Sequence, residues 1–304
     1  MRYRQLGRSG LTVSVVGLGC NNFGMRLDQE KARPVVDTAI EQGINLFDTA
    51  DVYGRGASET ILGELLKGRR DEAVIATKWG SPMSDNPPPA RGSRHYIRRA
   101  VEASLRRLQT DYIDLYQLHR FDPLTPVAET LGALDELVKE GKVRYIGSSN
   151  FTAWQVADAE WLARTNHTER YISAQNHYSL LQRDAEKELL PAAEAFGIGV
   201  LPFFPLANGL LTGKYGRDQE RPTGTRMDGR EITEATYDRI EALSDFAKQR
   251  GHTLLELAIS GLASRPPVSS VIAGATKAEQ VIANAKSGDW DLSAAELDEL
   301  AKLP

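Results

Sequence analysis

Short apolar segments alternate with amphipathic segments of helical length along almost the whole chain, and this alternation limits the fold more than any other feature. Apolar runs bounded by turn signals are typical of strands buried on both faces. The expected strands are 13–19, 44–48, 73–77, 112–118, 143–147, 171–174, 198–201 and 268–273. The expected helices are 29–42, 58–67, 94–108, 129–140, 152–164, 185–196, 236–250, 254–263, 277–286 and a last one opened by the capping-box pattern Ser293 to Glu296.

Eight strands that each precede a helix predict a parallel sheet covered by helices. In a chain of 304 residues they favour an α/β fold of the closed (β/α)8 TIM-barrel type. An open dinucleotide-binding sheet would require Gly-x-Gly-x-x-Gly after the first strand, and Gly17–Asn22 lacks the third glycine. We predict one domain over 1–304, with an N-terminal β-hairpin within Tyr3–Val15 and an extra C-terminal helix.

The composition excludes several classes of function. A formal net charge of -4 predicts no nucleic-acid partner. No run approaches the ~18 apolar residues that span a bilayer, so no membrane partner is expected either. The single cysteine, Cys20, excludes an intrachain disulfide and is typical of a reducing compartment. With no secretory leader visible, we expect a cytoplasmic protein.

Polar residues follow several expected strands and would converge at the mouth of a barrel. Asp48 and Tyr53 follow the second strand, Lys78 the third and His119 the fourth. A free tyrosine titrates near pH ~10, and a nearby ammonium would lower its pKa toward neutrality. Asp48 would compensate the charge of a buried Lys78, and His119 could donate a hydrogen bond to a carbonyl oxygen. This set suits proton transfer to an oxygen while hydride is delivered to carbon.

Each of these residues also has a simpler interpretation. Lys78 could be a solvated strand end, His119 a satisfied core histidine and Tyr53 a residue of loop packing. Four such coincidences at one barrel mouth are improbable together. A hydrolase is poorly supported, because the five histidines have no metal-ligand spacing and no Gly-x-Ser-x-Gly occurs. No metal is therefore expected. Asp51 is interpreted as a structural carboxylate of the loop.

The order and spacing of several motifs resemble the aldo-keto reductase family over nearly the whole chain. They are Gly17–Gly19 with Phe23-Gly24, Asn45–Gly54 with Ser58-Glu59, Ala76–Lys78, Asp111–His119, Gly141–Phe151 and Gly209–Tyr215. The resemblance implies an NAD(P)H-dependent reductase of aldehydes or ketones on a (β/α)8 barrel. In such an enzyme Tyr53 is the proton donor, Lys78 and Asp48 adjust the pKa of Tyr53, and His119 orients the carbonyl.

The resemblance also implies where an extended nicotinamide cofactor binds. Ser149, Asn150 and Gln175 match the positions that hold the carboxamide, with helix capping as the simpler interpretation of Ser149 and Asn150. Phe203 could stack on the nicotinamide, whereas Phe204 replaces a serine and puts one phosphate contact in doubt. The other cofactor positions implied are Gly19, Pro205, Leu206, Gly209, Leu210, Thr212, Lys214, Gly274, Thr276, Lys277, Gln280 and Asn284.

The adenosine end of the cofactor would meet a helix that begins near Thr276. Thr276 and Glu279 have the spacing of a capping box, and the helix dipole with Lys277 suits a 2'-phosphate. Gln280 and Ala283 depart from the family pattern, because many relatives have arginine and glutamate there. The helix dipole and Lys277 still favour NADPH (NADP+), with NADH as the alternative.

Substrate identity and oligomeric state do not follow from this sequence. The substrate is expected to be a small-molecule carbonyl compound, with Phe23, Trp79 and Phe121 as apolar walls of its pocket. Arg91 and Arg94 could meet an anionic group, but solvation of the Pro-rich loop is the preferred interpretation. The second functional hypothesis is a cofactor-binding redox-sensing regulatory subunit resembling potassium-channel beta subunits.

Overall fold

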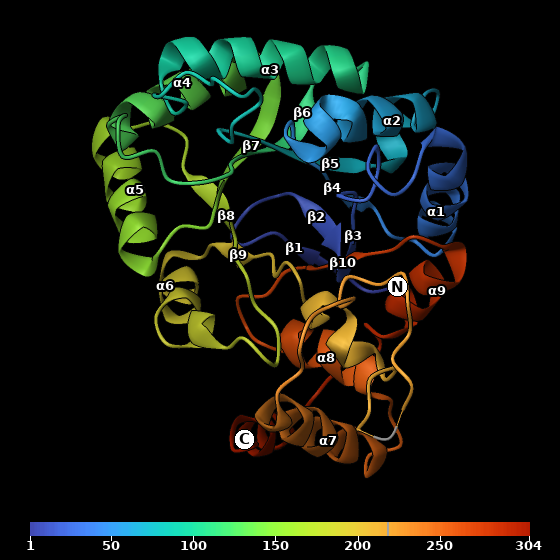
Figure 1. The fold of residues 1–304 in the computed structure, drawn as a ribbon. Coiled ribbons are helices and arrows are strands. Elements are labelled where there is room, and N and C mark those ends of the chain that lie inside the picture. Colours follow the sequence, from blue (N-terminus) through green and yellow to red (C-terminus); the bar gives the residue numbers. More distant parts are fainter. Residues whose placement is uncertain (218) are drawn as a thin grey trace.

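The computed structural model describes residues 1–217 and 219–304. The sequence also predicts that the long loop 207–235 helps to shape the pocket, and Asp218 of this loop lies outside the described residues. Eight parallel strands form one sheet in the order β10 (Val271–Gly274), β3 (Val16–Gly19), β4 (Leu46–Asp48), β5 (Val74–Trp79), β6 (Ile113–Leu118), β7 (Val143–Ser149), β8 (Tyr171–Gln175) and β9 (Gly199–Val200). Parallel bridges from Val200 to Val268 and from Phe203 to Ile272 bring the two ends of the sheet together. The predicted barrel is confirmed (Figure 1).

The register of the strands aligns the residues at their carboxyl ends. Gly19 lies beside Asp48, Lys78 beside Gln117, and Ser149 beside Gln175. Because neighbouring strands are parallel, the loops that follow them all open at the same end of the barrel. This register is the reason why polar residues far apart in the sequence share one mouth.

Helices surround the barrel on the outside (Figure 1). Most of them bury an apolar side in the main core, as Val35 and Val36 do in the first and Leu131 and Leu134 in the fourth, whereas the seventh packs on the eighth. They are α1 (Gln29–Glu41), α2 (Ala57–Leu65), α3 (Arg94–Leu108), α4 (Val127–Lys139), α5 (Ala153–Asn166), α6 (Leu189–Phe196), α7 (Glu234–Lys248), α8 (Leu254–Ala263), α9 (Ala278–Lys286) and α10 (Ala294–Ala301). Among the described residues, no helix is both long and apolar enough to cross a membrane.

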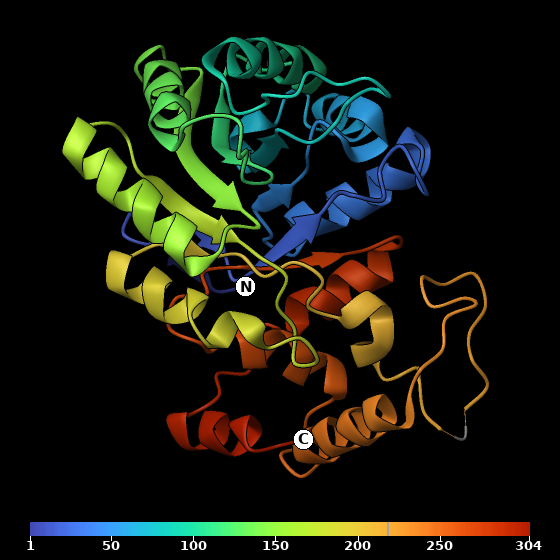
Figure 2. The same ribbon diagram turned by 60° about the vertical axis from the view of Figure 1, so that its left-hand side comes forward.

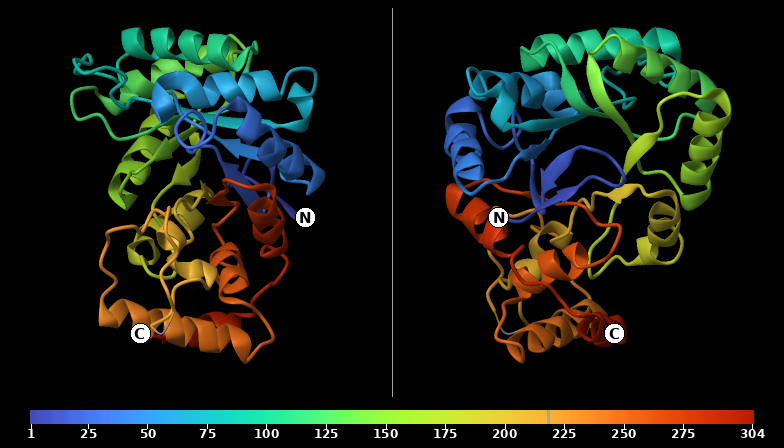
Figure 3. Two further views of the ribbon diagram at one scale, coloured as in Figure 1. Left: turned by 45° about the vertical axis from the view of Figure 1, so that its right-hand side comes forward. Right: turned by 180° about the vertical axis from the view of Figure 1, so that it is seen from behind.

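The N-terminal hairpin closes the end of the barrel opposite the loops that carry the site. It consists of β1 (Tyr3–Gln5) and β2 (Thr12–Ser14), antiparallel as predicted. Its Leu6 and Val13 are buried in one cluster with barrel residues such as Leu115 and Leu201. Seen from behind, the hairpin lies across the centre of the ring (Figure 3). The barrel interior is therefore packed at this end, and a ligand enters from the other.

Local sequence signals set several helix ends as predicted. Asp28, Ser93 and Ser293 accept hydrogen bonds from backbone N–H groups as the caps of α1, α3 and α10. The expected helix 185–196 instead begins at Leu189, after a separate turn at Asp184–Glu186. Pro191 has no N–H and is tolerated in the first turn of a helix, which favours a start just before it.

The expected capping box at Thr276 and Glu279 is wrong. Lys277 is the residue before α9, and no side chain caps this end. The side-chain oxygen of Gln280 instead accepts hydrogen bonds from the backbone N–H and the hydroxyl of Thr276, at 2.8 and 3.2 Å. Gln280 thus folds back over the loop and fixes the position of Thr276.

Candidate active site

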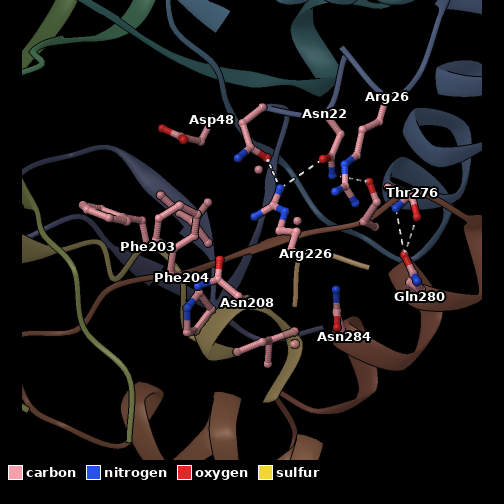
Figure 4. A pocket seen from close by; sticks show the side chains of 18 of the residues that line it. Asn22, Arg26, Asp48, Phe203, Phe204, Asn208, Arg226, Thr276, Gln280 and Asn284 are labelled. Atoms are coloured by element: carbon pink, nitrogen blue, oxygen red, sulfur yellow. Dashed lines mark hydrogen bonds between the residues drawn. The ribbon is translucent and has the colours of Figure 1, made fainter. Parts of the chain in front are cut away.

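A cavity of about 720 Å3 opens at the carboxyl ends of the strands (Figure 4). Three of the four predicted catalytic residues, Asp48, Tyr53 and His119, line it together. It also contains nearly all of the predicted cofactor positions: Gly19, Ser149, Asn150, Gln175, Phe203, Pro205, Leu206, Gly209, Thr212, Lys214, Gly274, Thr276, Lys277, Gln280 and Asn284. The exception is Leu210, which packs half-buried against the apolar core.

Lys78 lies directly beneath the cavity and is paired with Asp48. Its side chain is fully buried, and its Nζ donates to Asp48 Oδ1 and to the carbonyl oxygen of Thr49, both at 2.7 Å. The Nε2 of Gln175 donates to the same Asp48 oxygen at 2.7 Å. Burial lowers the pKa of Lys78, but Asp48 and Tyr53 raise it more, so its net pKa lies above the ordinary value. The side chain therefore stays an ammonium ion.

Tyr53 lies above this ion pair, with Lys78 Nζ at 5.1 Å from the centre of its ring. Burial raises the pKa of the Tyr53 hydroxyl, and the ammonium of Lys78 lowers it by less, so the net pKa is above the ordinary value. Lys78 thus acts on the pKa of Tyr53 in the expected direction, but the expected net decrease is wrong, because burial raises this pKa by more than one cation lowers it. Tyr53 carries its proton at neutral pH.

The loop that carries Tyr53 is shaped by tight backbone turns. Tyr53–Gly56 forms a short 3-10 turn directly before α2, and Gly54 and Gly56 have positive φ angles of 58° and 95°. Gly24, from the loop after β3, approaches so closely that a Cβ there would lie 2.3 Å from the Cβ of Ala57. Two loops of the barrel mouth are therefore packed against each other beside Tyr53.

His119 faces Tyr53 edge to face, with ring centres 5.9 Å apart. Burial, then the charges of Lys78 and Arg120, lowers the pKa of His119 to about 3. The imidazole is therefore neutral at physiological pH and offers one N–H donor. Its backbone is held on both sides, because His119 N donates to Trp79 O at 2.8 Å and Asn150 Nδ2 donates to His119 O at 2.9 Å.

Ser149, Asn150 and Gln175 form a connected polar group next to Asp48. The hydroxyl of Ser149 donates to Gln175 O at 2.9 Å, and Asn150 Nδ2 also contacts the Ser149 oxygen at 3.0 Å. Helix capping does not explain these residues, because the cap of α5 is Thr152, in a reciprocal capping box with Gln155. All three residues line the cavity, and amide and hydroxyl groups of this kind can bind a planar amide.

The structure corrects the three predicted substrate contacts, none of which lines the cavity. Phe23 and Trp79 are fully buried, and Trp79 stacks on Tyr116 with ring centres 4.3 Å apart. Phe121 packs edge to face against Phe151 on the outer side of the barrel mouth. Their large apolar side chains gain more by entering the core under the loops than by facing an open polar cavity. Arg91 donates to the Gly80 and Pro88 carbonyls. It therefore supports the Pro-rich loop, in line with the preferred interpretation, and does not line the cavity.

Sequence reasoning missed an arginine at the centre of the cavity. Arg226 Nη2 donates to Asn21 Oδ1 at 3.2 Å and to Asn22 Oδ1 at 3.0 Å (Figure 4). It thereby joins the loop before α7, orange in Figure 2, to the loop after β3. Burial and the charge of Arg26 lower the pKa of Arg226 from its ordinary value. No motif distinguishes Arg226 from other loop arginines; only the chain path brings it here.

A scan against family models matches residues 15–303 to the model described as the aldo/keto reductase family. The chain belongs to the aldo/keto reductase family. It is 41% identical over 293 residues, 92% of this chain and 89% of the relative, to the uncharacterized oxidoreductase YrpG of Bacillus subtilis. It is 36% identical to a probable voltage-gated potassium channel subunit beta of Oryza sativa, covering 95% of this chain and 92% of that one. It is 35% identical to the L-glyceraldehyde 3-phosphate reductase of Escherichia coli, covering 94% and 87%.

As an aldo/keto reductase family enzyme the protein is an oxidoreductase, and the family typically uses NAD(P)H. The charges of its cavity are strongly asymmetric. Asp48 is the one carboxylate among the described residues that line it, and Lys78 already neutralises that carboxylate. The positively charged lining residues are Arg26, Arg120, Lys214, Arg226 and Lys277. A cavity of this kind favours a polyanionic ligand.

Proposed function

We propose that the protein reduces an aldehyde or ketone to an alcohol with NADPH, reversibly, with Tyr53 as the proton donor. The observation that carries this proposal is the contact set of Tyr53, Lys78, Asp48 and His119. A protonated phenol and a neutral imidazole face one cavity above a buried ion pair. This combination can donate hydrogen bonds to a carbonyl oxygen and protonate it.

The residues present fit a nicotinamide dinucleotide. The polar group of Ser149, Asn150 and Gln175 suits the carboxamide, and Phe203 offers a ring beside it, with His177 stacked at 5.5 Å between ring centres. The cationic residues along the cavity suit the phosphates. When bound, the cofactor supplies the hydride. Gly209, Thr212, Lys214, Thr276 and Asn284 would hold its remaining parts.

Each catalytic residue has a separate task in this proposal. Tyr53 gives its proton to the carbonyl oxygen as negative charge develops there. Lys78 stabilises the resulting phenolate, and Asp48 keeps Lys78 charged and in place. His119, neutral throughout, donates a hydrogen bond that orients the carbonyl against Tyr53. In the direction of alcohol oxidation, the phenolate accepts the proton.

The positive charge around the cavity supports NADPH over NADH. Arg26 and Lys277 lie on its side nearest Thr276, and Arg226 lies between Thr276 and Asp48 (Figure 4 for Arg26, Arg226, Thr276 and Asp48). A 2'-phosphate adds nearly two negative charges, and arginine can bind it through paired hydrogen bonds. Arg26 and Arg226 thus compensate for the absence of an arginine at position 280.

A regulatory subunit remains the second candidate, supported by the similarity to proteins named potassium channel subunit beta. Such a protein would bind the cofactor tightly and turn over negligibly on a broad carbonyl panel. The complete set of four residues in one contact network favours the enzyme.

The test is Tyr53→Phe, assayed by NADPH oxidation over aldoses, aromatic aldehydes and ketones. We expect turnover to fall by about 10²–10⁴-fold with NADPH affinity unchanged, because only the acid is removed. Tyr112→Phe is the matched control, since Tyr112 packs against Arg70 and Arg144 away from the cavity. Comparable turnover in Tyr53→Phe and the wild type would refute the mechanism.

A further inference from the structure

Arg120 lies in the reacting part of the cavity and has no task in the mechanism above. It directly follows His119 and lines the cavity with Tyr53, His119 and Asn150. Its side chain is exposed, and its charge is close enough to contribute to the lowered pKa of His119. A guanidinium at this position stands beside the site where the carbonyl is reduced.

The carboxylates nearest to Arg120 in the sequence are bound elsewhere. Asp122 accepts hydrogen bonds from the N–H groups of Gly92 and Leu124 and from the hydroxyl of Thr125, at 2.6, 3.0 and 2.8 Å. Glu129 accepts from Arg94 N at 3.0 Å. Within the described part of the chain, Arg120 forms no ion pair of 4.0 Å or less. Its charge is available to a ligand.

The backbone that carries Arg120 is nevertheless well held. His119 is anchored through its N–H to Trp79 and through its carbonyl to Asn150. The Asp122 bonds hold the loop on the other side of Arg120. The stem of the arginine therefore starts from an ordered segment, which reduces the entropy lost when the guanidinium binds.

The other cations of the cavity come from other loops than Arg120. Lys277 adjoins Thr276 and Arg26 lies beside it, whereas Arg226 lies between Thr276 and Asp48 (Figure 4 for Arg26, Arg226, Thr276 and Asp48). These residues, with Lys214, are sufficient for the phosphates of the dinucleotide. Arg120 directly follows His119 and acts on its pKa, so it lies where the substrate rather than the cofactor phosphates is expected.

We propose that Arg120 binds a carboxylate or phosphate of the substrate, and that the enzyme acts on small aldehydes or ketones that carry such an anionic group. This rests on the proposed carbonyl reduction. The planar guanidinium pairs with two oxygens of either anion and so fixes the distance from the anion to the carbonyl at His119 and Tyr53. Arg120 is thus a specificity-determining residue. It contributes a charged group to a pocket whose walls the sequence predicted to be apolar.

The test compares matched pairs of substrates that differ in one anionic group. One pair is 4-carboxybenzaldehyde and benzaldehyde, and the other is glyceraldehyde 3-phosphate and glyceraldehyde. We expect the wild type to prefer the anionic member of at least one pair by about 10–100-fold in kcat/KM, the ratio expected for charge-assisted hydrogen bonds. The pair that shows the preference distinguishes carboxylate from phosphate.

Substitution of the arginine then assigns the preference to a residue. Arg120→Gln should abolish it by raising KM for the anionic member while leaving the neutral member within about twofold. Arg120→Lys should retain part of it, because the charge stays but the paired geometry is lost. Arg33→Gln, on the exposed side of α1, is the control and should change neither substrate. Equal losses on both members of a pair, or no preference in the wild type, would overturn the proposal.

A binding experiment separates this proposal from that of carbonyl reduction. If no carbonyl compound is turned over, the proposed reaction fails, but benzoate and glycerol 3-phosphate can still be titrated into the NADP+-loaded protein by calorimetry. Binding of one of them to the wild type and its loss in Arg120→Gln would support the anion site by itself. Absent binding, or equal binding to both proteins, would overturn it.

Discussion

The two halves of the cavity are built differently. The half around Asp48 comes from strand ends, and there Lys78, Asp48 and Gln175 are buried and joined by hydrogen bonds of 2.7 Å. The half around Arg226 comes from loops, and there Arg226 donates to two amide oxygens, at 3.2 and 3.0 Å, and lies over the ring of Phe204 at 5.7 Å from its centre. The charges of the first half are paired with each other, whereas among the described residues Arg26, Arg226 and Lys277 of the second half form no ion pair of 4.0 Å or less.

This difference follows from burial. A buried ammonium without a partner costs several kcal/mol, so Lys78 must be paired as soon as the chain folds. Arg226 is only half-buried, and Arg26 and Lys277 are exposed, so water can solvate them until a ligand binds. The buried charges are thereby placed on strand ends and the solvated ones on loops.

The strongest test of the strand-built half is Lys78→Met. Removing the ammonium leaves Asp48 buried without its cation, and we expect a loss of about 3–5 kcal/mol in the free energy of unfolding. Turnover should fall as well, because the phenolate of Tyr53 loses its stabilising charge. Thermal unfolding and steady-state kinetics measure the two effects.

Lys248→Met is the control for this substitution. Lys248 also pairs with an aspartate, Asp245, but the two side chains are 71% and 68% exposed. A pair of that kind contributes at most about 1 kcal/mol. If the two variants lost equal stability, burial would not be what distinguishes the strand-built half.

Asp51 is a buried carboxyl in the loop between Asp48 and Tyr53, and among the described residues it has no cation of its own like the one that pairs with Asp48. It is buried with Oδ1 unpartnered among the described groups, and burial and then Glu59 raise its pKa to about 8. The native state therefore keeps a proton that the unfolded chain releases near pH ~4. As pH rises between these two values, the free energy of unfolding falls by up to about 1.4 kcal/mol per pH unit from this group.

Asp51→Asn should remove that slope. We expect the stability of the variant relative to the wild type to increase by a few kcal/mol between about pH 5 and pH 8, measured by urea unfolding across that range. Asp245→Asn, at an exposed residue of α7, serves as the comparison and should leave the slope unchanged. A variant whose pH profile parallels that of the wild type would show that Asp51 is ionised in the folded protein.

Arg226→Gln probes the loop-built half and should have the smallest effect. We expect about a tenfold rise in the Kd for NADPH, or about 1.4 kcal/mol, with folding stability nearly unchanged. The difference should shrink at high salt, because the interaction is partly exposed. Fluorescence titration measures it, with Arg230→Gln from the same loop as the control. A stability loss as large as that of Lys78→Met would mean that both halves depend on internal pairing.

Sequence reasoning reached further in the strand-built half than in the loop-built half. Asp48, Lys78 and His119 stand at strand ends, so the barrel prediction alone brought them to one mouth. Arg226 lies in a long loop whose path no periodic pattern specifies, and Arg120 has no motif of its own. Trp79 and Phe23 were misassigned because hydrophobicity predicts burial equally well in a core and in a pocket wall.

The sequence by itself determined the alternation of strands and helices, the barrel, and the four residues of the proposed reaction, because periodicity and strand ends are local properties of the chain. The tertiary structure alone decided the protonation of Tyr53, whose pKa depends on how much solvent the folded loops exclude as well as on Lys78. It also decided which cations face the cavity. Burial and proximity across loops arise only when the whole chain has packed, and they are the quantities on which a charge in a site depends.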